Sequence, residues 1–116
     1  MESKYLIKMT NTANRNMDDI SDYISDELMN PVAAMDLIDD LERTIKKRLD
    51  IFPYGYPVHT FLESLGIEYR RTVIGNFTVF YKIIEPKKEE EKGLVVVNHI
   101  VYSARDIEKI VINDEE

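Results

Sequence analysis

Apolar side chains recur every three or four residues in two consecutive stretches of the first half of the chain, the spacing of one buried helix face. We expect the first helix to be capped by Asn11 or Thr12 and to end near Met29. Asn30-Pro31 suits the N-cap and first position of a second helix, which should run to about Ile51. Because their connection is so tight, the two helices should form an antiparallel hairpin. The apolar positions are Ala13, Met17, Ile20, Ile24 and Leu28 in the first helix and Ala34, Ile38, Leu41, Ile45 and Leu49 in the second.

The pattern changes to that of strands on either side of this hairpin. Lys4–Met9 is expected to be a first strand, while Thr72–Ile84 and Leu94–Tyr102 are almost continuously apolar, which is typical of strands buried on both faces. Within the first of these two stretches, Gly75-Asn76 predicts a two-residue hairpin turn of type II′, because glycine occupies the first central position. The charged segment Pro86–Lys92 should be a solvated connection to the last strand.

The remaining segments connect or follow these elements. FPYGYP at residues 52–57 should end the second helix, and Val58–Gly66 is expected to be less regular. Ser103 and Asp106 form a possible capping box for a short helix over Ala104–Val111. The fold class predicted is therefore α+β, in the order β-α-α-β-β-β with a short C-terminal helix. A mostly antiparallel four-stranded sheet should carry the helical hairpin on one face, and residues 1–116 should form a single domain.

Composition indicates the cellular compartment in which this domain should act. The chain has no cysteine, which excludes disulfides and thiolate metal sites and favours a reducing compartment. The apolar patch near the N-terminus is too short for a signal peptide, and no apolar run approaches the ~20 residues that span a bilayer. We therefore expect a soluble cytoplasmic protein with no membrane partner.

Charge is distributed unevenly along the chain, whose net charge is −7. Residues 12–51 hold ten acids and five bases, whereas residues 66–105 hold five acids and seven bases. The acidic clusters at residues 18–22 and 39–40 have the spacing of solvated helix faces, although they would also suit a basic partner segment. The distribution predicts a molecule with an acidic helical side and a mildly basic sheet side.

The basic residues of the sheet lie at the ends of its apolar strands. Arg70, Arg71 and Arg105 are expected at the rims of the sheet, where a guanidinium can bind phosphates or carboxylates. Because consecutive strand residues face opposite sides, only one of Arg70 and Arg71 should point toward a given partner. Together with Lys82, these three arginines form the predicted partner-binding set.

Several uncharged or titratable residues have two interpretations each. His99, in the last strand, could act as a general base or could be a structural hydrogen-bonding group, whereas His59 is expected to be exposed. Tyr69 and Tyr81 could stack on nucleic-acid bases or could fill the core. The two histidines lack the spacing of a metal site, so neither a metal nor another cofactor is predicted.

In element order and in several local motifs, the chain resembles the RelE/ParE superfamily of type II toxin–antitoxin toxins. The resemblance covers nearly the whole chain and favours the ParE-like, plasmid-stabilisation branch. The motifs are NPVAAMDLIDDLERTI, the FP pair at residues 52–53, YRRTVIGNFTVFYKI and VYSARDIEKI. The resemblance implies a toxin that inhibits growth when free and is neutralised by a cognate antitoxin protein.

Two mechanisms follow from the resemblance. RelE-like toxins cut messenger RNA on the ribosome without a metal, which here would use Arg71, Arg105, His99 and Tyr81 as catalytic residues. Three positions depart from that pattern. Thr78 stands where an arginine is expected, Ala104 or Arg105 stands at a second arginine position, and Ile110 stands near the position of a tail tyrosine.

ParE-like toxins instead poison DNA gyrase by binding, with no chemistry of their own. An inert relic that still binds antitoxin would lack the same nuclease residues. In each case, the sheet face opposite the helices should expose apolar surface rimmed by Arg71, Lys82 and Arg105, as a partner-binding site does.

Overall fold

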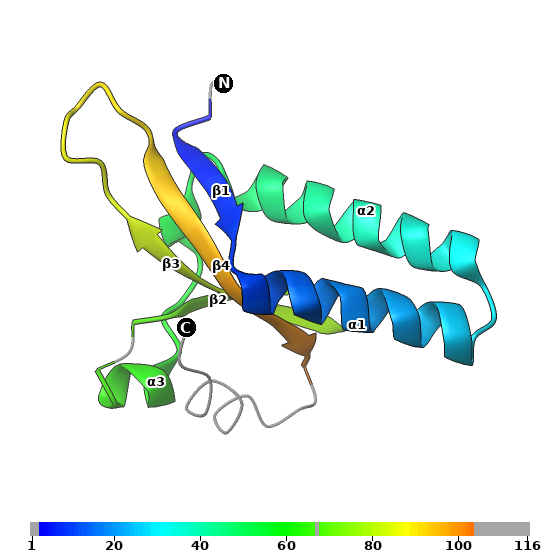
Figure 1. Ribbon diagram of the computed structural model, residues 1–116. Helices are drawn as coiled ribbons and strands as arrows, with labels where there is room; N and C mark the ends of the chain where they lie inside the picture. The colour runs from blue at the N-terminus through cyan, green and yellow to red at the C-terminus, as the bar shows by residue number, and fades with distance from the viewer. Residues whose placement is uncertain (1–2, 67, 104–116) are drawn as a thin grey trace.

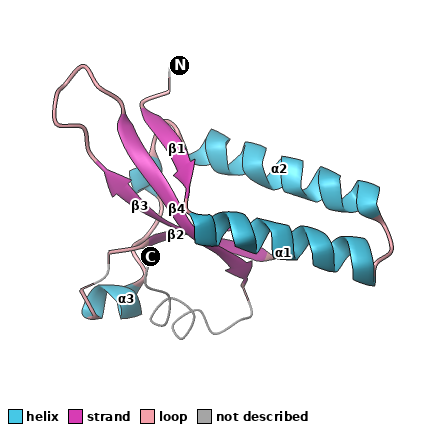
Figure 2. Ribbon diagram, viewed as in Figure 1, coloured by secondary structure: helices cyan, strands magenta, loops and turns pink. Residues whose placement is uncertain are grey.

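A computed structural model describes residues 3–66 and 68–103 of the chain as a sheet with a long helical hairpin on one face (Figure 1, Figure 2). The predicted α+β class and element order are confirmed over these residues. The predicted C-terminal helix over Ala104–Val111, and the capping box that precedes it, extend outside the described residues. In chain order the elements are β1 (Tyr5–Met9), α1 (Asn11–Glu27), α2 (Pro31–Leu49), a 3₁₀ turn (Pro53–Gly55), α3 (Thr60–Ser64), β2 (Arg70–Ile74), β3 (Phe77–Ile84) and β4 (Gly93–Tyr102).

The four strands form one sheet in the order β1-β4-β3-β2. β1 runs parallel to β4, whereas the β4–β3 and β3–β2 pairs are antiparallel, so the sheet is mostly antiparallel as predicted. The turn between β2 and β3 joins Ile74 to Phe77, and Gly75 adopts a φ of +59°. Among the described non-glycine residues only Met29 has a positive φ, so the φ of Asn76 is negative. A positive φ at the first central residue alone is the type II′ geometry.

The caps of the two long helices explain where each begins. Asn30 caps α2 as predicted, because its side chain accepts a hydrogen bond from the Ala33 amide at 3.0 Å. The cap of α1 is Thr10, and the prediction of Asn11 or Thr12 was wrong. The amide of Thr10 donates to Val97 O of β4, and this bond is the last one between β1 and β4. The hydroxyl oxygen of Thr10 accepts from the Ala13 amide at 3.1 Å. One residue therefore ends the strand and starts the helix.

The main core lies between the hairpin and one face of the sheet. Leu28 does not belong to it, although it continues the apolar stripe of α1, because it is 64% exposed at the end of the helix. Figure 1 shows the reason, since the hairpin extends well beyond the sheet and its far end has no sheet to pack on. The fully buried members of the core include Ala13, Met17, Ile20 and Ile24 of α1, Ala34, Leu41, Ile45 and Leu49 of α2, and Phe77, Val79, Tyr81, Val95, Val97 and Ile100 of the sheet.

A second, smaller cluster lies on the other face of the sheet. It consists of Leu62, Tyr69, Phe80 and Val101, all buried. Leu62 comes from α3, a short helix in the stretch 58–66 that the sequence predicted to be less regular. This segment covers part of the sheet face that was predicted to expose apolar surface, so Phe80 and Val101 are buried there.

A β-bulge in β4 changes which side chains face the helices. Phe80 pairs with His99 and Tyr81 pairs with Val97, so Asn98 is an extra residue on β4. The backbone of the bulge is bonded to the start of α1. The Thr10 hydroxyl donates to Asn98 O at 3.2 Å, and Asn16 Oδ1 accepts from the Ile100 amide at 2.9 Å. Beyond the bulge, Ile100 enters the main core and His99 faces the opposite side.

Candidate functional site

Arg70 and Arg71 lie on opposite faces of β2, as strand alternation predicted. Arg71 pairs with Phe80 of the smaller cluster and is exposed on the face away from the helical hairpin. Arg70 pairs with Tyr81 of the main core and is half-buried. Its guanidinium lies over the Tyr54 ring, 5.0 Å from the centroid, and donates to Tyr56 O at 2.7 Å. Arg70 therefore holds the 52–57 loop, while Arg71 is available to a partner.

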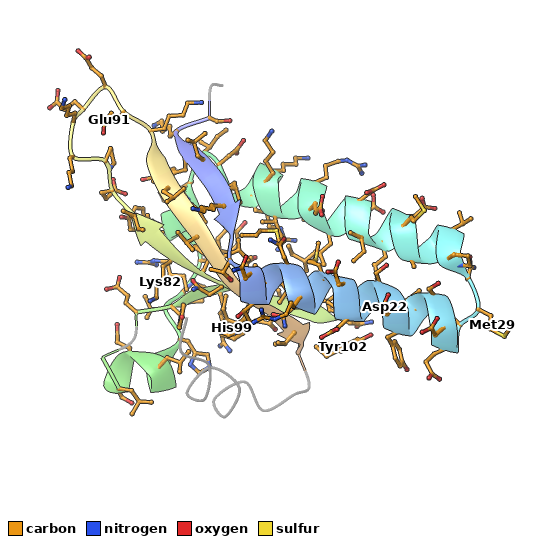
Figure 3. The ribbon with its side chains drawn as sticks, in the orientation of Figure 1. Asp22, Met29, Lys82, Glu91, His99 and Tyr102 are labelled. Atoms are coloured by element: carbon orange, nitrogen blue, oxygen red, sulfur yellow. The ribbon has the colours of Figure 1, made fainter. Side chains whose placement is uncertain are left out.

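Lys82 shares the face of Arg71. It follows Phe80 by two residues on β3, so both side chains leave the sheet in the same direction, and Figure 3 shows Lys82 on the sheet away from the helical hairpin. Its ammonium lies over the ring of Tyr69 at 4.8 Å from the centroid, a cation–π contact. Lys82 is nevertheless exposed. An exposed lysine and an exposed arginine thus belong to one sheet face.

The structure also brings Lys82 together with Arg70, a second member of the predicted partner-binding set. Both line a cavity of about 270 Å³ at the end of the β2–β3 pair, with Tyr54, Glu68, Ile83 and Ile84. Its charged groups are two cations and one carboxylate, an arrangement that favours an anionic ligand over a cation. We call these six residues the basic cleft.

Glu85 fixes one wall of the basic cleft. Its Oε1 accepts hydrogen bonds from the hydroxyls of Tyr5 and Tyr54, each at 2.8 Å. Partial burial and this hydrogen bond raise the pKa of Tyr5 to about 12. The bond to Glu85, followed by partial burial, also raises the pKa of Tyr54. Both hydroxyls therefore stay protonated near neutral pH and link β1, β3 and the 52–57 loop.

Tyr81 and His99, two of the predicted catalytic residues, are both buried. The Tyr81 hydroxyl donates to Pro53 O at 2.6 Å on the helical side of the sheet, and burial raises its pKa. His99 is 2% exposed on the other side, and its ring meets Tyr69 edge-on at 6.2 Å between centroids. The structure thus separates these two residues by the thickness of the sheet. Arg105, the remaining predicted catalytic residue, lies outside the described residues.

His59 and Thr78 also have structural surroundings. His59 was expected to be exposed, but it is buried, with its ring 5.7 Å from that of Phe80. It caps α3 by accepting from the Leu62 amide at 3.4 Å, and this role buries it beneath the segment that covers the sheet. Thr78 is buried and its hydroxyl is 2.8 Å from that of Ser103. Both side chains are therefore buried and do not belong to the exposed surface of the sheet face.

Within the described parts of the chain, 3–66 and 68–103, no group of three or more acidic or histidine side chains is placed to hold a metal ion. No helix there has the length and apolar character needed to cross a bilayer.

Comparison with known proteins identifies the fold. No protein-family model matches the chain, and no curated protein matches it. One solved structure, described as the chromosomal ParDE TA system from P. aeruginosa, contains a chain that superposes with a TM-score of 0.65 at 15% identity. The match covers 85% of this chain and 96% of that chain. The fold is RelE/ParE-like. At this identity the match shows the shared architecture alone, so the RelE/ParE-like chain must be assigned a function from its own surfaces.

Sequence reasoning found the arginines and the lysine of this RelE/ParE-like domain but missed the basic cleft. Arg70 and Lys82 lie close together through the β2–β3 hairpin, but Tyr54 comes from the distant 52–57 loop, and nothing local marks it as their neighbour. Glu85 could have been singled out, since it is a carboxylate placed directly after an apolar strand. Its two tyrosine partners depend on the tertiary fold.

Proposed function

We propose that this RelE/ParE-like domain is the toxin of a type II toxin–antitoxin system, inhibiting growth when free and neutralised by a cognate antitoxin. The observation that supports this most is the superposition on a chain of the ParDE system over 85% of this chain. The exposed cations Arg71 and Lys82 on the face away from the hairpin support it further, because they offer a binding surface for an acidic partner segment. The protein is proposed to act in the cytoplasm.

Within this function we propose that the toxin acts by binding, as a gyrase poison. RNA cleavage without a metal needs a base for the 2′-hydroxyl and cations for the developing charge. The candidate bases are buried, since Tyr81 is bonded to Pro53 and His99 is 2% exposed. Thr78 is neutral and cannot replace a cation. Neither Tyr81 nor His99 is therefore exposed to act as a base on RNA. Such a surface fits binding better than catalysis.

The alternative is a ribosome-dependent endoribonuclease. It is favoured by the exposed Arg71 and Lys82 on one sheet face, the latter over the ring of Tyr69, since cations and aromatic rings are the groups that bind RNA. In this alternative Arg71 and Arg105 stabilise the phosphate charge. A catalytically silent relic that binds antitoxin is the third form of the proposal.

Inducible expression tests the function. The chain alone should arrest growth of a bacterial host, and co-expression of a neighbouring antitoxin gene should relieve the arrest. Gyrase–DNA adducts and a DNA-damage response in the arrested cells would support the poison, whereas ribosome-phased breaks in mRNA would support the nuclease. Normal growth with soluble, folded chain but retained antitoxin binding would favour the relic. Normal growth without any antitoxin binding would contradict the proposal.

Charge reversal tests the surface. The double variant Arg71→Glu with Lys82→Glu should weaken antitoxin binding more than tenfold and reduce toxicity, because each charge-assisted contact is worth about 1.5–3 kcal/mol. Lys87→Glu with Lys88→Glu is the matched control, since it makes the same charge change in the exposed 86–92 connection. Equal antitoxin affinities for the two double variants would show that the sheet face is not part of the antitoxin-binding site. Reversal at Arg105 extends the test to the predicted residue outside the described range.

A further inference from the structure

The far end of the helical hairpin exposes a cluster of large apolar side chains. Leu28, Met29, Val32 and Met35 are 64%, 85%, 67% and 66% exposed. We call these four residues the hairpin tip. Figure 3 shows Met29 at the outer end of the hairpin, away from the sheet. Isolated exposed apolar residues are ordinary, but four large ones within eight positions at one protruding end are a concentration of the kind that marks an interaction site.

The hairpin tip continues into an apolar groove. Leu28 belongs to both, and it lines the groove with Tyr23 and Leu37 on the helical side and Phe77 on the sheet side. The groove has a volume of about 370 Å³, which accommodates one or two large side chains of a partner. Asp40 also lines it, and this carboxylate accepts a hydrogen bond from Arg43 at 2.7 Å in an exposed ion pair.

The charged side chains in the sequence on either side of the tip are acidic. Residues 18–42 contain nine acids and no lysine, arginine or histidine. The bases of the hairpin lie toward its other end. They are Arg15 near the start of α1, Arg43 within α2, and Lys46, Lys47 and Arg48 in the last turn of α2. The acids are Asp18, Asp19, Asp22, Asp26, Glu27, Asp36, Asp39, Asp40 and Glu42.

We propose that the hairpin tip and its groove bind a cationic amphipathic helix of a partner protein. Apolar anchors of such a helix, spaced at three and four residues, would occupy the groove and cover the tip, while its lysines and arginines would meet the surrounding carboxylates. Two methionines suit this role because their unbranched side chains adapt to the shape of the partner. This surface lies on the hairpin, apart from the cations of the sheet face, and the proposal does not depend on the toxin function.

Charge argues against a second copy of the chain as the occupant. Two hairpins meeting tip to tip would bring two acidic stretches close together, in molecules that each carry a net charge of −7. Each stretch holds nine carboxylates over residues 18–42, of which Asp40 is paired with Arg43. Like charges facing across an interface oppose association. A cationic segment relieves this repulsion and a second copy increases it.

The test uses a designed peptide of leucine and lysine that forms an amphipathic helix of roughly 18 residues. Its control has the same leucines with glutamate in place of lysine. Calorimetric titration against the full chain should show binding of the lysine peptide that weakens with salt, and no binding of the glutamate peptide. Failure of the lysine peptide to bind, or equal binding of both peptides, would overturn the proposal.

Variants locate the contact. Leu28→Gln, Val32→Gln and Met35→Gln combined should lower the affinity by at least about tenfold, since each removes apolar area from the contact while keeping a helix-forming side chain. Leu6→Thr with Val73→Thr is the matched control, because both residues are about half exposed on the sheet and threonine suits a strand. An equal loss in both sets, or no loss in the tip variant, would overturn the proposal. So would a concentration-dependent dimer that the tip variant abolishes.

Discussion

Arg48 near the end of α2 donates through Nη1 to Val73 O of the edge strand β2 at 2.7 Å, and the same nitrogen donates to Thr72 Oγ1 at 2.9 Å. The preceding loop bonds to the start of the same edge, since Arg71 N donates to Pro57 O and Tyr69 O accepts from the His59 amide. A helix side chain thus adds to the protection of an edge strand that could pair with another chain.

Replacement of Arg48 by methionine should therefore destabilise the fold by about 1–2 kcal/mol, because a charge-assisted bond to a strand carbonyl is lost. Urea denaturation measures this change, and light scattering should report more association through the open edge. Lys47→Met is the control, since Lys47 carries the same charge in the same helical turn and is exposed. Equal stabilities of the two variants would show that the bond contributes nothing.

The buried hydroxyl of Tyr81 gives a second prediction. Tyr81→Phe leaves Pro53 O without the bond it accepts at 2.6 Å, and should cost about 1–3 kcal/mol of folding free energy. Tyr23→Phe should change stability by far less, because Tyr23 is half exposed and the ring that packs edge-on to Tyr102 is kept. Thermal denaturation of the two variants measures both losses of stability. A Tyr81→Phe variant as stable as the parent would mean that the 52–57 loop is held by other contacts.

Met29 occupies the left-handed region with a φ of +50°, directly after the C-cap of α1. Side chains with a Cβ are strained there and glycine is not. Met29→Gly should raise the free energy of unfolding by about 0.5–1 kcal/mol. Leu28→Gly should lower it by a similar amount, since Leu28 has a right-handed φ of −94° that gives glycine no advantage. The same sign for both variants would contradict this account.

The bonds from Tyr5 and Tyr54 to Glu85 predict a pH dependence. Because the folded-state pKa of Tyr5 is about 12, against an ordinary value of 10, its contribution to stability is complete below pH 10 and is lost as pH rises toward 12. The raised pKa of Tyr54 acts in the same direction. Glu85→Gln should lower both tyrosine pKa values and make the loss of stability over this window shallower.

Titration of tyrosine-labelled protein by NMR, with denaturation followed from pH 9 to about pH 12, measures both effects. Glu63→Gln serves as the control, because Glu63 is an exposed carboxylate on α3 and bonds to neither tyrosine. Unchanged titration of Tyr5 and Tyr54 in Glu85→Gln would rule out the carboxylate as the cause of the raised values.

The sequence by itself determined the elements with strong local causes. The apolar spacing located both helices, Asn30-Pro31 fixed the start of α2, and Gly75 fixed the turn between β2 and β3. Strand alternation separated Arg70 from Arg71 correctly. These features depend on residues close in sequence, whose propensities and spacing act before any distant contact forms.

The tertiary structure decided what depends on distant contacts. The bulge at Asn98 places His99 away from the hairpin, and it is bonded to Thr10 and Asn16, more than eighty residues earlier. The burial of His59 likewise requires the 52–66 segment to pair with β2 at Val58 and Arg70, and the basic cleft requires Tyr54 of the same segment to meet Arg70. No local pattern specifies such pairings, because their free energy comes from packing and hydrogen bonds between segments that meet only in the folded state.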